Sequence, residues 1–211
     1  FSSFSGKKGL PKYSNRFNII LNNKYLLNKY NCRGFKMIED NVDLKLLGQD
    51  QLLPWLQHDI SQVTQSIMIV GPWLDAYFVA KVLDSMQTTK IGVCFLVRID
   101  GDELIDAKTL SALNLARENL ENFQARTLPY LHSKVILLDQ ALFYLGSANW
   151  YWYSLHKSLE TTITGKIDIL PGLTTEMDRY WEKATPLTRE DLKNYHDLEP
   201  HQRDPYRYRL K

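Results

Sequence analysis

Residues 132–149 constrain the fold of this 211-residue chain more than any other stretch. They contain two short apolar runs, residues 135–138 and 141–145, which are separated by the polar pair Asp139-Gln140. Apolar runs of this length are typical of strands buried on both faces of a sheet, and the polar pair indicates a tight turn. The sequence therefore predicts a β-hairpin with polar residues at its open end.

These polar residues form a candidate phosphate site. His132 and Lys134 are two residues apart, so on an extended chain they project from the same face. Ser147 and Asn149 repeat this spacing after the second run. Ammonium, hydroxyl and carboxamide groups can hold phosphate oxygens, and an imidazole can act as nucleophile or base. The alternative is a buried, hydrogen-bonded His132 beside a solvated Lys134.

The same residues resemble the HKD motif of the phospholipase D superfamily, whose pattern is H-x-K-x4-D-x6-G-S-x-N. Every fixed position of the pattern is matched, by His132, Lys134, Asp139, Gly146, Ser147 and Asn149. The superfamily also places a glutamate beyond the asparagine, and Glu160 fits this position. The order of helices and strands resembles one lobe of the family over residues 50–183, although the specific signal is confined to residues 132–160.

The resemblance implies a phosphodiesterase that needs no metal and no cofactor, because lysines take the part of a metal ion. His132 would attack phosphorus to form a phosphohistidine, and a second histidine would protonate the leaving oxygen. Lys134 and Asn149 would hold the oxygens of the pentacoordinate phosphorus. A carboxylate orients the histidine in this family. Glu160 or Asp139 can take that part, and Asp139 can instead cap the tight turn.

The chain carries one such motif, whereas enzymes of the family need two that face each other. The other histidines are not followed by a lysine two residues later; they are His58, His156, His196 and His201. The second motif must therefore come from another copy or from polypeptide outside this sequence, which starts at Phe1 without an initiator Met. We expect a homodimer with one composite active site.

Helical and strand patterns alternate between residues 50 and 131. We predict helices at 50–65, 75–86 and 103–120, and strands at 66–70, 91–97 and 123–127. After the motif we predict an aromatic helix or loop at 150–158, a strand at 159–164, and helices at 174–183 and 188–195. This alternation indicates an α/β fold, a phospholipase D-like lobe with a mainly parallel or mixed sheet and helices on both faces. Ligands then bind beyond the strand ends, where His132 and Asn149 fall.

Charge is distributed unevenly along the chain. The net charge is +2, yet residues 1–38 contain eight basic residues and no acidic ones, and the last ten residues are again basic. Such segments are either arms that contact a polyanion or solvated basic surface. We predict a basic N-terminal extension or small accessory segment at 1–45, a catalytic domain at 46–198 and a basic tail at 199–211.

The basic segments and the aromatic run 150–153 favour nucleic acid as substrate, DNA rather than RNA, since aromatic rings beside a cationic cleft can stack bases. The alternative is that the run is a helix packed over the site. An endonuclease is the favoured activity; a phospholipid-hydrolysing enzyme and a non-catalytic nucleic-acid-binding or assembly module are the alternatives. No apolar run approaches the length of a membrane span. Two cysteines, Cys32 and Cys94, do not make a disulfide framework, which favours an intracellular location.

Overall fold

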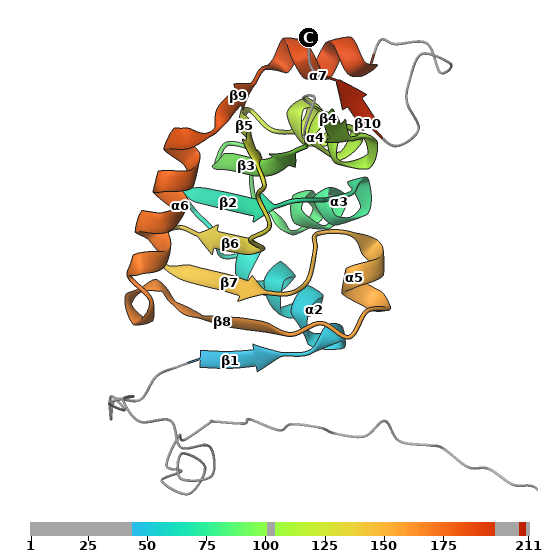
Figure 1. Ribbon diagram of the computed structural model, residues 1–211. Coiled ribbons are helices and arrows are strands. Elements are labelled where there is room, and N and C mark those ends of the chain that lie inside the picture. Colours follow the sequence, from blue (N-terminus) through green and yellow to red (C-terminus); the bar gives the residue numbers. More distant parts are fainter. Residues whose placement is uncertain (1–43, 101–103, 197–206, 210–211) are drawn as a thin grey trace, which may run out of the picture. The chain divides into compact units, whose positions relative to one another are not determined.

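The computed structural model describes residues 44–100, 104–196 and 207–209. The predicted basic extension lies outside the described residues up to residue 43, and so does most of the predicted basic tail. The described residues are built around an eight-stranded sheet with the strand order β1-β8-β7-β6-β2-β3-β5-β9 (Figure 1). Its strands are β1 (Leu44–Leu47), β2 (Ser66–Gly71), β3 (Gly92–Ile99), β5 (Asn122–Pro129), β6 (Val135–Leu138), β7 (Leu142–Gly146), β8 (Thr162–Lys166) and β9 (Thr185–Leu187).

The sheet is mixed. Strands β2, β3 and β5 run parallel to one another, and the other neighbouring pairs are antiparallel. The α/β class is confirmed, and of the two predicted sheet types the mixed one is observed. The reason is that β6, β7 and β8 follow one another without a crossover helix, and strands joined in this way pair antiparallel. A second, two-stranded sheet pairs β4 (Leu104–Asp106) with β10 (Arg207–Arg209).

The helices begin close to the predicted positions. They are α2 (Gln49–Ile60), α3 (Ala76–Ser85), α4 (Ala107–Asn119), α5 (Trp152–His156), α6 (Gly172–Lys183) and α7 (Arg189–His196), with a 3-10 turn, η2 (Ile167–Ile169). Asp75 caps α3 by accepting a hydrogen bond from the Phe78 amide at 2.9 Å. Asp106 caps α4 in the same way, so the helix predicted from residue 103 starts later, after strand β4. No helix in the described part of the chain is long and apolar enough to cross a membrane.

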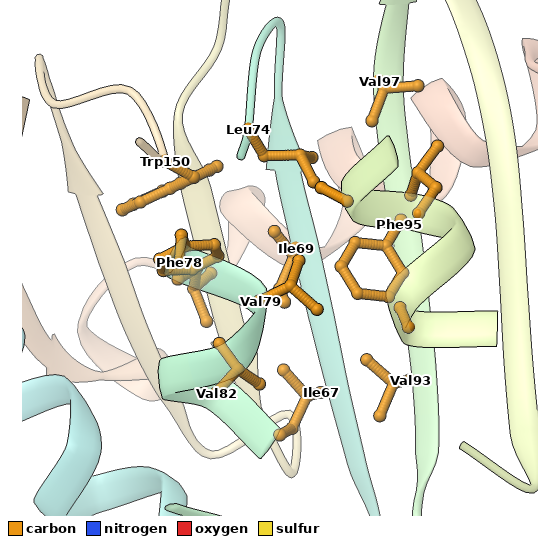
Figure 2. Close-up of a cluster of buried hydrophobic side chains, with 14 of the residues drawn as sticks. Ile67, Ile69, Leu74, Phe78, Val79, Val82, Val93, Phe95, Val97 and Trp150 are labelled. Carbon is orange, nitrogen blue, oxygen red and sulfur yellow. The ribbon is translucent and has the colours of Figure 1, made fainter. Parts of the chain in front are cut away.

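Helices cover both faces of the sheet, with α6 on one face and α2 to α5 on the other (Figure 1). Apolar side chains of β2 and β3 pack beneath α3 and α4; they include Ile67, Ile69, Val93 and Phe95 (Figure 2). The alternate residues of the same strands, among them Val70 and Leu96, pack on the opposite face with Met177 of α6. All four residues of β6 are buried, as the apolar run predicted. The hairpin that carries the motif is therefore buried between two helical layers.

Candidate active site

The ends of several strands meet at one rim of the sheet. Strand β6 starts beside the end of β2, because Val135 pairs with Val70. Strand β8 starts beside the end of β7, because Thr162 pairs with Gly146. Residues 130–134, 147–151 and 159–161 are among the connections at this rim. The pairing of the strands thus gathers the predicted site residues, except Asp139, from three separate segments.

His132 is exposed at the rim, and Lys134 is buried beside it. The Nζ atom of Lys134 donates to the His132 carbonyl oxygen at 2.7 Å and lies 3.2 Å from each ring nitrogen of His132. Burial lowers the pKa of the Lys134 ammonium, and the nearby negative charge of Glu160 opposes this effect. The alternative prediction of a buried histidine beside a solvated lysine is therefore wrong, because the histidine is exposed and the lysine is buried. This arrangement leaves the imidazole open to a substrate and a cation close to it.

Glu160 is fixed by two hydroxyl groups. It accepts hydrogen bonds from Ser147 Oγ at 2.5 Å and from Ser154 Oγ at 3.0 Å. Ser147 is held in turn by residue 161: the Ser147 Oγ accepts from the Thr161 amide at 3.1 Å. Among the described residues no hydrogen bond joins Glu160 to the His132 ring. Within one chain, Glu160 therefore positions Ser147 and stabilises the charge of Lys134.

Asn149 is half-buried, and its Oδ1 atom is buried without a hydrogen-bond partner among the described residues. A buried polar atom left unpaired costs about 1–3 kcal/mol, so packing within this chain does not account for the position of the amide. A half turn of the amide exchanges its oxygen and its NH2 group. The NH2 group can then donate to an oxygen of a bound phosphate, which is the part the sequence suggests for Asn149.

Asp139 lies at the other end of β6, away from His132. Its carboxylate accepts hydrogen bonds at 2.8–2.9 Å from the backbone amides of Thr64, Gln65 and Ser66. Burial alone raises the pKa of this carboxyl, but the hydrogen bonds from these residues together lower it below its ordinary value. Positive φ angles of 51° and 52° at Asp139 and Gln140 form the predicted tight turn. Asp139 thus lies in the tight turn, and its carboxylate binds the segment that precedes β2.

Two further residues lie at this rim and were not predicted from the sequence: one contacts His132, and the other contacts the first. Trp73, which follows β2, meets the His132 ring edge to face, with ring centroids 6.1 Å apart and an interplanar angle of 86°. Arg98, near the end of β3, places its guanidinium carbon 5.8 Å from the Trp73 ring centroid. The signal that could have found them is their place at the carboxyl ends of two predicted parallel strands.

The aromatic run 150–153 divides between core and surface. Trp150 is fully buried, stacks on Phe78 with ring centroids 5.4 Å apart and donates from Nε1 to the Val70 carbonyl at 2.8 Å. Trp152 and Tyr153, in α5, are 43% and 58% exposed. Core packing therefore explains the first tryptophan, and the two residues of α5 remain available to a ligand.

The rim combines an exposed imidazole, a buried ammonium and neutral polar groups. Lys134 and Arg98 contribute cationic side chains to it. Among the described residues no three His, Cys, Asp or Glu side chains are grouped so that they could hold a metal ion. Such a set of groups is suited to binding a phosphodiester and to nucleophilic attack on it.

Comparisons with known proteins agree with this geometry. A family model described as "Cardiolipin synthase, PLD-like domain" matches residues 56–182. Cardiolipin synthase A of Pseudomonas putida (strain W619) is 26% identical over 144 residues, which cover 66% of this chain and 30% of the relative. The chain thus spans less than a third of the length of that relative.

Solved structures share the fold at low sequence identity. The phospholipase D family member Nuc from Salmonella typhimurium matches with a TM-score of 0.58 and 13% identity, over 69% of this chain and 97% of that one. NucT from Helicobacter pylori matches with a TM-score of 0.54 and 16% identity, over 69% and 100%. Phosphatidylserine synthase from Haemophilus influenzae Rd KW20 has a TM-score of 0.55 and 13% identity, over 68% and 39%.

Proposed function

Because this chain belongs to the phospholipase D superfamily, we propose that it is a phosphodiesterase that cleaves nucleic acid, DNA in preference to RNA, through a phosphohistidine intermediate. The observation that carries the proposal is the contact between the exposed His132 ring and the buried Lys134 ammonium. A nucleophile must be accessible to phosphorus. A cation stabilises developing negative charge more strongly where water is excluded.

In the proposed reaction a ring nitrogen of His132 attacks phosphorus, and the bond between phosphorus and the leaving oxygen breaks. A second imidazole gives its proton to that oxygen. The same imidazole then takes a proton from water, which attacks phosphorus and releases His132. Lys134 and Asn149 donate hydrogen bonds to the non-bridging oxygens while their charge grows. Ser147 donates its hydroxyl proton to Glu160, which holds Ser147 in place beside these groups.

The second imidazole would come from a second copy of the chain. A twofold axis through the rim would place each His132 opposite the other, because an isologous interface brings the same residues of both copies together. A stable interface of this kind buries more than about 1,000 Å² in total. Metal ions have no part in the proposed mechanism, since Lys134 of each copy would supply the positive charge.

A nucleic-acid substrate is supported by the exposed aromatic residues Trp152 and Tyr153 of α5, whose rings can stack bases. The basic residues of segment 1–38 give further support, although they lie outside the described residues. Phospholipid is the competing substrate, because two of the similar proteins are named cardiolipin synthase and phosphatidylserine synthase. A module that binds nucleic acid without cleaving it is the third candidate.

Turnover of single- and double-stranded DNA, measured beside phosphatidylcholine vesicles, separates the three candidates. We expect the wild-type protein to cleave DNA and the His132→Ala variant to bind DNA without cleaving it. Hydrolysis of the phosphatidylcholine, without cleavage of the DNA, would identify a lipid enzyme instead. Binding of DNA by both proteins, with cleavage by neither, would identify a non-catalytic module.

Hydrolysis of bis-p-nitrophenyl phosphate is expected to persist in excess EDTA. The reason is that His132 supplies the nucleophile and Lys134 the positive charge, so chelation removes nothing from the proposed reaction. The measurement is release of p-nitrophenol with and without chelator, with His132→Ala as the background. Loss of activity on chelation and its recovery with magnesium would contradict the mechanism.

Removal of residues 1–15 is expected to weaken DNA binding and to flatten its salt dependence. The segment contains Lys7, Lys8 and Lys12, and each phosphate contact adds about one unit to the slope of log K against log salt. Binding is measured by fluorescence anisotropy over a salt series, and hydrolysis of the small substrate serves as the control for folding. Equal affinity and slope in both proteins would assign the segment to solvated surface.

A further inference from the structure

We propose that Arg98 and Trp73 form a second binding position beside the reacting phosphate, and that it holds the neighbouring phosphate of a nucleic-acid strand. The inference rests on the proposed function and specifies its substrate. A substrate that uses both positions must carry at least two phosphates joined by a short linker. Nucleic acid meets this condition, and a phospholipid with a single phosphate does not.

His132, Trp73 and Arg98 form a row across the rim. Strands β2 and β3 are parallel, so the residues at their carboxyl ends lie at the same edge. The Trp73 ring is close to both other side chains: it meets the His132 ring edge to face, and the Arg98 guanidinium carbon lies 5.8 Å from its centroid. The nucleophile and a second cation thus share one indole ring as a neighbour.

The backbone on either side of Trp73 is fixed. The Trp150 amide donates to the Trp73 carbonyl oxygen at 3.2 Å, and Leu74 forms a parallel bridge with Trp150. Trp150 is itself fully buried. The half-buried Trp73 ring is therefore fixed in position beside Arg98. Its aromatic face can stack on the base next to the cleaved bond.

Asp100 orients the Arg98 side chain by binding one of the N–H donors of the guanidinium. The Nε atom of Arg98 donates to Asp100 Oδ1 at 2.6 Å, and the two side chains are 28% and 23% exposed. A guanidinium carries five N–H donors, so the hydrogen bond at Nε sets its plane while the Nη atoms remain for a ligand. Two such donors can bind one phosphate in a bidentate manner.

The other arginines of residues 44–196 use their Nη atoms within the fold. Arg117 donates from Nη2 to Asn114 and Glu118, and Arg126 donates from Nη1 to the Trp181 carbonyl. Arg179 is bound by Glu176, and Arg189 reaches the carbonyls of residues 117 and 121. For Arg98, no hydrogen bond from an Nη atom is found among the described residues. Arg98 is thus the arginine of this region that is both at the rim and open to an anion.

The test compares substrates with one phosphate and with several. Single-stranded deoxynucleotides of increasing length are assayed beside bis-p-nitrophenyl phosphate, which has one phosphate. We expect the wild-type protein to prefer the trinucleotide over bis-p-nitrophenyl phosphate in kcat/KM, mainly through a lower KM. Arg98→Ala should reduce this preference about tenfold, the effect of one lost hydrogen bond between charged groups. Arg98→Lys, which keeps the charge but loses the fork, should reduce it less.

Arg179→Ala is the matched control, because it removes the same charge from α6, which covers a face of the sheet. It should leave the preference unchanged. Circular dichroism shows whether Arg98→Ala folds. If it does not, Arg98→Lys is the test: a preference for the trinucleotide equal to that of the wild-type protein would overturn the proposal.

Two outcomes separate the failure of this inference from the failure of the proposed function. If bis-p-nitrophenyl phosphate is not hydrolysed by a reaction that depends on His132, the proposed function itself fails. If it is hydrolysed, and Arg98→Ala keeps the full preference for the trinucleotide, the second binding position is refuted. Cardiolipin also carries two phosphates, so cardiolipin vesicles form a separate arm. Preferred hydrolysis of these vesicles that depends on Arg98 would overturn the assignment to nucleic acid.

Discussion

Phosphodiesterase activity is expected to fall toward the square of the wild-type fraction when wild-type chains are mixed with His132→Ala chains. A composite site needs one imidazole to attack phosphorus and another to protonate the leaving oxygen. A mixed dimer has only one of the two and is expected to stall. With one quarter of wild-type chains, about one sixteenth of the activity should remain, because only dimers of two wild-type chains work.

Two other histidines whose side chains the structure describes, His58 and His156, lie in helices. His156 lies in α5, where its Nε2 atom is 2.8 Å from the Tyr77 hydroxyl. His58 lies in the last turn of α2. The His132→Ala homodimer should therefore lose activity by about a thousandfold or more, as expected when a nucleophile that acts in concert with other groups is removed.

The experiment requires that the chains exchange or are expressed together, with two tags that allow the fractions to be measured. Sedimentation of the wild-type protein gives the oligomeric state independently. Arg179→Ala chains mixed in the same ratios form the control, and they should leave the activity unchanged. A linear fall with His132→Ala, or a fully active monomer in solution, would refute the composite site.

Local sequence signals predicted the central elements of the fold well. The strands β2 and β6 are short apolar runs, and Asp75 precedes a helical pattern as a side-chain cap. The edge strands β1 and β9 were not predicted, since they contain only four and three residues and show no clear alternation. They form because a neighbouring strand offers unpaired backbone groups, which is a property of the assembled sheet.

In the candidate site, too, the local contacts could be predicted from the sequence and the long-range contacts could not. His132, Lys134, Ser147 and Asn149 could be predicted to meet because one hairpin joins them, and its register is local. The part played by Asp139 could not be decided, because its hydrogen-bond partners lie more than seventy residues earlier in the chain. Trp73 and Arg98 were missed for a similar reason: their place at the same rim as His132 depends on the pairing of three strands, β3, β2 and β6.

Gly146→Ala is expected to destabilise the protein and to reduce its activity. A Cβ atom at residue 146 would lie 2.4 Å from the Thr161 carbonyl oxygen and 2.7 Å from the Thr162 Cα atom. Both neighbours are backbone atoms of an adjoining segment, so no flexible side chain can give way. Gly146 is paired with Thr162 across β7 and β8, and the Ser147 amide donates to the Thr161 carbonyl at 3.0 Å. Overpacking of this kind costs about 1–3 kcal/mol of the free energy of unfolding.

The loss of activity should exceed what the loss of stability explains, because the strain falls on the segment that carries the site. Moving residue 146 away from β8 shifts Ser147, which holds Glu160, and changes the position of Asn149. Under conditions in which the variant remains folded, we therefore expect at least a tenfold fall in kcat/KM, as expected when catalytic groups are displaced by a fraction of an ångström to an ångström.

Gly172→Ala provides the matched comparison for the same chemical change. A Cβ atom at residue 172, the first residue of α6, meets no atom within 4 Å. Alanine in a helix is favoured over glycine by up to about 1 kcal/mol, so this variant should be as stable as the wild type or more stable. Urea unfolding followed by circular dichroism gives both free energies, and bis-p-nitrophenyl phosphate hydrolysis gives both activities. If Gly146→Ala matched Gly172→Ala in stability and activity, the close contact between β7 and β8 would not be what positions the site, and the arrangement of Ser147, Asn149 and Glu160 would need another physical cause.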